Sequence, residues 1–136
     1  MIDDTAFRIF FLFHILSVVV AFAPAVLSVL PGSAEGARAT LERAGRTVYS
    51  PALVLAGLFG ILCLVTSDVG GSRVFDFDQT WVSLAFVVWI AMIGVFHGMV
   101  LAGQRQGDGG KVTNGEAIMT VLLLVMLYLM IWKPGL

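Results

Sequence analysis

Two histidines within long apolar stretches are the residues of this sequence best suited to chemistry. His14 lies in FLFHILSVVVAF, and His97 lies in IGVFHGMVLAG. Because ionisable side chains inside a membrane are costly and usually functional, each imidazole is a candidate ligand for haem or copper, or a candidate proton carrier. The alternative is a neutral imidazole that hydrogen-bonds to a serine or a carbonyl oxygen of a neighbouring helix. The sequence favours this structural role and leaves both open.

Other reactive side chains give weaker signals. Cys63 is the single cysteine, which excludes an internal disulfide bond and a multi-cysteine metal site. Asp76 and Asp78 could form a catalytic carboxylate pair, but neighbouring acidic residues in a loop are usually solvated. A helix face with three methionines could bind copper(I), although such residues are more often core filler or face lipid. These methionines are Met119, Met126 and Met130. We therefore predict no catalytic residue and no cofactor, with haem or copper at the histidines as the alternative.

The composition determines the class of protein that can hold these groups. Of the 136 residues, 59% are hydrophobic and only 12% are charged, whereas a soluble domain has about a quarter charged residues. No soluble fold of this length could cover so much apolar surface. The formal net charge of −1 provides no basic surface for nucleic acid. The sequence thus predicts an all-α polytopic membrane protein whose first partner is the lipid bilayer.

Four apolar runs are long enough to cross the hydrocarbon core, which needs about 20 helical residues. We place these spans near residues 5–30, 50–67, 79–103 and 115–133, and we assign residues 1–136 to one membrane domain, a four-transmembrane-helix bundle. The acidic start of the chain and the length of its first apolar run predict a retained span instead of a cleaved signal peptide.

Predicted capping residues mark the starts of the later spans. Ser50, followed by proline, is predicted to cap the second span, and Asp78 the third. Thr113 and Glu116 have the spacing of a capping box and are predicted to open the fourth.

Lysine and arginine counts in the short loops predict the orientation. One side of the membrane would hold Arg38, Arg43, Arg46, Arg105 and Lys111, and the other would hold Arg8, Arg73 and Lys133. Since basic residues favour the cytoplasmic side, both termini are predicted to lie outside, with the protein in the inner (plasma) membrane of a bacterium.

Small residues at helical spacing predict how the spans pack, because they let helix backbones approach closely in lipid. The predicted packing residues are Ser17, Ala21 and Ala25 in the first span, Ala52, Ala56 and Gly60 in the second, and Gly94, Gly98 and Ala102 in the third. The opposite face of the third span, which is rich in tryptophan, phenylalanine and methionine, is predicted to meet lipid. Spans one to three would form the tight core, with the fourth packed more loosely outside.

The depths of the two histidines bear on whether they could share a cofactor. At ~1.5 Å per residue, His14 would lie about 15 Å and His97 about 27 Å below the outer starts of their spans. Two ligands on one iron need nearly equal depth, so an offset on the order of 12 Å argues against a shared haem.

Three segments carry a resemblance to a known family: FLFHILSVVVAF, GRTVYSPALVLAGLFGILCL and FDFDQTWVSLAFVVWIAMIG. The sequence resembles a family of small bacterial four-helix integral membrane proteins of unknown function, distantly similar to the copper-resistance D type membrane domain. The resemblance to the latter implies copper handling. From the residues themselves we expect a non-enzymatic membrane or accessory-subunit protein, alone, as a homo-oligomer or in a larger membrane complex. A haem- or copper-binding redox protein that uses His14, His97 or both is the alternative.

Overall fold

The computed structural model describes residues 5–27, 43–69 and 72–134, which are almost entirely helical. Within these residues, four helices are long and apolar enough to cross a membrane. The first is α1 (Thr5–Leu27), and the last is α6 (Gly109–Trp132). The second joins a π-helical turn, η1 (Gly45–Tyr49), to α3 (Ser50–Val65), and the third runs through α4 (Thr80–Val95), the π-helical η2 (Phe96–Leu101) and α5 (Ala102–Gln106). The protein is therefore all-α in these residues, as predicted.

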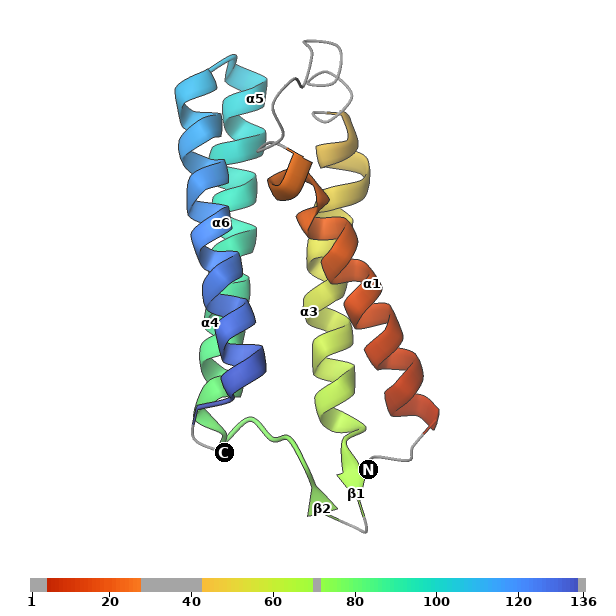
Figure 1. The fold of residues 1–136 in the computed structure, drawn as a ribbon. Helices are drawn as coiled ribbons and strands as arrows, with labels where there is room; N and C mark the ends of the chain where they lie inside the picture. Colours follow the sequence, from red (N-terminus) through yellow and green to blue (C-terminus); the bar gives the residue numbers. More distant parts are fainter. Residues whose placement is uncertain (1–4, 28–42, 70–71, 135–136) are drawn as a thin grey trace.

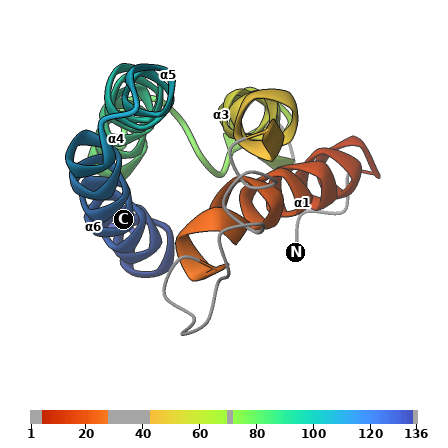
Figure 2. The same cartoon turned by 90° about the horizontal axis from the view of Figure 1, so that it is seen from above.

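The helices form two antiparallel pairs placed side by side. α1 packs along α3, and α6 packs along α4 and η2. Seen from above, the order around the bundle is α6, α4, α3 and α1 (Figure 2). The start of α1 and the end of α6 lie at the end of the bundle that also carries the short strands β1 (Asp68–Val69) and β2 (Ser72–Arg73), and α5 lies at the other (Figure 1).

The largest buried cluster joins the two helix pairs in the half of the bundle nearer α5. It consists of Ala21, Ala52, Leu53, Met92, Phe96, Val100, Leu101 and Met119. Every one of the four long helices contributes a side chain. In a bilayer, where lipid is as apolar as these residues, close van der Waals contact would have to hold the cluster together.

The helix starts differ from the predicted capping residues. The second helix already extends back to Gly45, so Ser50 lies inside it and caps nothing. α4 follows Gln79 without a side-chain cap, so Asp78 is not the capping residue. α6 begins at Gly109, where the Asp108 carboxylate accepts a hydrogen bond from the backbone N–H of Lys111 (3.0 Å).

The predicted capping box therefore lies inside α6. Thr113 donates its hydroxyl proton to the carbonyl oxygen of Gly109 (3.0 Å), as threonine does within a helix. The helix begins earlier because the left-handed Gly107 (φ 68°) turns the chain directly before Asp108, which then supplies an acceptor one turn ahead of the box.

The prediction for the packing face of the third helix is wrong as far as contacts within the chain are concerned. Gly94 and Gly98 are exposed, and a Cβ atom built on either would meet nothing within 4 Å. The bulky face points inward instead, since Trp81, Met92 and Phe96 are buried. The third helix supplies large side chains, and its neighbours supply the small residues that receive them.

The fourth helix also packs more tightly than predicted. Gly115 of α6 lies so close to η2 that an added Cβ would stand 2.9 Å from Val100 Cγ2 and 3.0 Å from Met99 Cβ. At Gly103, an added Cβ would stand 2.9 Å from Cγ2 of Val112 in α6. The predicted core of spans one to three is thus replaced by two helix pairs, one of which contains α6.

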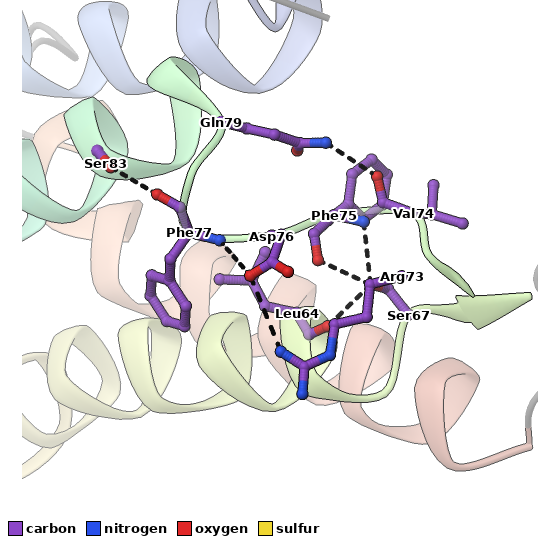
Figure 3. Close-up of polar contacts among 9 residues, drawn as sticks. All are labelled: Leu64, Ser67, Arg73, Val74, Phe75, Asp76, Phe77, Gln79 and Ser83. Carbon is purple, nitrogen blue, oxygen red and sulfur yellow. Dashed lines mark hydrogen bonds and ion pairs between the residues drawn. The ribbon is translucent and has the colours of Figure 1, made fainter. Parts of the chain in front are cut away.

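A polar anchor fixes the loop between the helix pairs at the strand-bearing end. Ser67 is fully buried, and its Oγ lies 2.8 Å from the carbonyl oxygen of Leu64 and 3.2 Å from that of Phe75. The same hydroxyl accepts the backbone N–H of Phe75 (3.1 Å), and the Ser67 carbonyl accepts that of Val74 (2.8 Å) (Figure 3). Ser67 thereby ties the end of α3 to the chain that enters α4.

Replacing Ser67 with alanine is expected to lower the free energy of unfolding by about 1–3 kcal/mol, because the half-buried N–H of Phe75 loses its acceptor. Unfolding by SDS titration from mild detergent, followed by circular dichroism, measures this. Thr66→Ala is the control, since the Thr66 hydroxyl donates only within its own helix, to Leu62 (2.7 Å). An equal loss in both variants would contradict the anchoring role of Ser67.

Candidate functional site

His14 binds the second helix through one ring nitrogen. Its Nδ1 lies 2.7 Å from the carbonyl oxygen of Ala56, and because a carbonyl only accepts, Nδ1 carries the proton and donates it. The half-buried ring packs against Gly60, where an added Cβ would stand 3.3 Å from the imidazole Cε1. In the neutral ring Nε2 then keeps its lone pair, and the structure shows no hydrogen bond to it from the residues it describes.

His97 uses both ring nitrogens on protein groups. Nδ1 lies 2.9 Å from the carbonyl oxygen of Ile93, one turn back, and so donates to it. Nε2 lies 2.8 Å from Oγ of Ser50, so in the neutral ring it accepts the serine proton. The hydroxyl that was expected to cap the second helix instead joins that helix to the third.

The two histidines approach the second helix at different depths. His14 binds it at Ala56, and His97 binds it at Ser50, six residues earlier. At ~1.5 Å per residue this separation is about 9 Å along the helix axis. Such a spacing is unfavourable for one iron held by both rings. Among the residues that the structure describes, no group of three or more histidine, cysteine or carboxylate side chains could hold a metal ion.

Trp89 makes a third polar contact with the second helix. Its indole Nε1 donates to the carbonyl oxygen of Leu53 (2.9 Å). The ring lies directly on Gly57, where an added Cβ would stand 2.0 Å from the ring atom Cε2. Trp89 belongs to the tryptophan-rich face of the third span that was predicted to meet lipid, and Gly57 is not among the predicted packing residues. The sequence signal that could have identified this contact is a glycine in the second span at a depth that a tryptophan of the third span can reach.

The other predicted packing residues divide between the inside and the outside of the chain. Ser17, Ala21, Ala52 and Ala56 are buried, Gly60 and Ala102 are half-buried, Gly94 and Gly98 are exposed, and the side chain of Ala25 lies outside the described part of the structure. The first two spans therefore meet through their small-residue faces. The third does not use its small face within the chain.

The remaining chemical candidates are held in structural contacts or lie apart. Asp76 pairs with Arg73 (3.8 Å) and accepts the backbone N–H of Phe77 (2.7 Å), whereas Asp78 is exposed (Figure 3). Cys63 is a free, half-buried thiol.

Of the three methionines, Met119 belongs to the buried cluster and Met126 packs against it. They fill space between helices, as their flexible side chains suit them to do.

Comparison of the chain with protein-family models, with curated protein sequences and with solved structures finds no match. The chemistry that the site could support therefore follows from its geometry. That geometry consists of three polar side chains that bind the first seven residues of α3 from two sides, with one free imidazole nitrogen, Nε2 of His14, among the described residues.

Proposed function

We propose that the protein is a non-enzymatic, multi-pass protein of the bacterial inner membrane, with both chain ends outside, that acts as an accessory subunit. The observation that supports this proposal is that polar side chains within the helices hydrogen-bond to neighbouring helices. His14, Trp89 and His97 each bind a neighbouring helix, and they do not converge on a common point. Polar groups that satisfy one another across helices in this way help to hold a bundle together.

A partner would bind the exposed small-residue face of the third helix, where Gly94 and Gly98 permit close approach of another helix. This face also carries Val87, which is 64% exposed. The partner is either another membrane protein or a second copy of the chain. Lipid alone on this face is the competing account.

Site-specific photocrosslinking in native membranes tests the accessory role. A photoreactive amino acid at Val87 should give one discrete cross-linked product of higher mass. The matched control is Leu124 on α6, which is 61% exposed and should cross-link only to lipid. Equal, diffuse labelling from both positions would contradict the proposal.

A second candidate function, haem or copper binding, is favoured by one observation. The Nδ1–H of His14 donates to a backbone carbonyl and leaves Nε2 as a free donor of electrons, which is how metal-ligating histidines are commonly oriented. His97 is less suited, because both of its nitrogens are engaged. Copper is included because of the resemblance noted above.

Titration of the purified protein with hemin or with Cu(I) tests this candidate. Stoichiometric binding that is lost in His14→Ala and kept in His97→Ala would support it. Binding that is absent, or equal in both variants, would exclude a site at His14.

A further inference from the structure

Exposed arginines gather at the end of the bundle where α5 turns into α6. Arg46 is the second residue of the second apolar span, Gly45–Val65, and Arg105 is the penultimate residue of the third, Thr80–Gln106. Both side chains are exposed, as is that of Arg43, close to Arg46 in the chain. Within the part of the chain that the structure describes, none of the three guanidinium groups forms an ion pair.

Among the described residues, the nearby polar groups do not neutralise these arginines. Asp108 directs its carboxylate to the start of α6, where it accepts the N–H of Lys111. The Lys111 ammonium group donates to Oε1 of Gln106 (3.4 Å) and adds a further positive charge. At the other end of the bundle, by contrast, Arg73 is paired with Asp76, and Lys133 lies over the ring of Phe75 (4.3 Å).

Two of these arginines lie next to a close contact between the second and third helices. Gly45 is buried against the third helix, and an added Cβ would stand 3.6 Å from Leu101 Cδ2 and 3.8 Å from Gln104 Oε1. Arg46 follows Gly45 in the chain, and Arg105 follows Gln104. Arg46 and Arg105 therefore flank one packed contact between η1 and the end of the third helix, at the α5 end of the bundle (Figure 1).

We propose that this junction binds the headgroup of an anionic phospholipid, with Arg46 and Arg105 as the main contacts. Each arginine lies at the end of an apolar span, where lipid phosphates would lie beside it. A guanidinium group can donate two parallel hydrogen bonds to phosphate oxygens. Both arginines belong to helices long and apolar enough to span a membrane, so acyl chains would lie directly beside them, which favours a lipid over a soluble anion. The site goes beyond the accessory role and does not depend on it.

Native mass spectrometry of the protein in mild detergent tests the lipid site, with phosphatidylglycerol as the probe and phosphatidylcholine as the neutral comparison. Each interfacial arginine should strengthen binding about fivefold, so the two together should favour phosphatidylglycerol by about 25-fold. Arg46→Gln with Arg105→Gln should remove this preference. The double variant Arg46→Lys with Arg105→Lys should keep part of the preference for phosphatidylglycerol. Because it preserves both positive charges, it also tests the site if the glutamine variant does not fold.

Arg73→Gln, at the opposite end, is the charge-matched control and should bind phosphatidylglycerol as the wild type does. Equal binding of the two lipids by the wild type would overturn the proposal, and so would an equal loss in Arg73→Gln. Displacement of phosphatidylglycerol by millimolar inorganic phosphate would also overturn it, because the site would then recognise a soluble anion.

Discussion

Replacing Gly57 with alanine is expected to lower the free energy of unfolding by about 2–3 kcal/mol, although alanine normally favours a helix over glycine. The new methyl group would overlap the indole of Trp89, which cannot move aside without losing its hydrogen bond to Leu53. SDS-induced unfolding in mixed micelles measures the change. The sign of the change is informative, because helix preference alone would make the alanine variant more stable and only the overlap with Trp89 makes it less stable.

Gly94→Ala and Gly98→Ala are the matched controls, since nothing lies within 4 Å of a Cβ atom at either position. These variants should be neutral or more stable by up to about 1 kcal/mol, the helix preference for alanine over glycine. Trp89→Phe in the Gly57→Ala background should recover part of the loss. A destabilising effect at Gly94 and Gly98 with none at Gly57 would mean that the third helix is turned the other way.

Replacing Gly115 with alanine should cost a similar amount, about 2–3 kcal/mol. Here an added Cβ would meet not only Val100 Cγ2 but also the backbone nitrogen of Val100, at 3.2 Å. Backbone atoms cannot rotate away, so α6 must move off η2 and lose contacts along the interface. The same unfolding measurement applies.

Gly98→Ala is again the control, because Gly98 lies in the same π-helical segment, two residues before Val100, and a Cβ atom there would meet none of the described residues within 4 Å. Equal tolerance of alanine at Gly115 and Gly98 would restore the original prediction of a loosely packed fourth helix.

The sequence was sufficient to predict that the described residues form four long apolar helices, because hydrophobic length is a property of each segment alone. It also placed Ser17 and Ala21 on the inner face of α1, where they are buried. It failed for the third helix because both of its faces are apolar, and hydropathy cannot tell which one meets protein. The deciding residues, Gly57 and Gly115, lie on the neighbouring helices.

The sequence was sufficient to predict which type of group each histidine would hydrogen-bond to, but not which residue would provide that group. A neutral imidazole bonded to a serine or a carbonyl was one of two interpretations, and the structure pairs His97 with Ser50 and His14 with Ala56. A backbone carbonyl leaves no mark in the sequence, so the His14 partner could not have been named. Ser50 was assigned to a helix cap because serine before proline usually starts a helix, and tertiary contact overrode that preference.

The central claim is that His14 holds two helices together through Nδ1, and the stability of two isosteric variants tests it most directly. The amide nitrogen of asparagine can replace Nδ1 as the donor to Ala56, whereas glutamine places its amide near the position of Nε2. His14→Asn should therefore remain within about 0.5 kcal/mol of the wild type, and His14→Gln should lose about 1 kcal/mol, the usual contribution of one such hydrogen bond. If instead His14→Asn is as destabilised as His14→Gln, Nδ1 is not the group that matters and the claim is wrong.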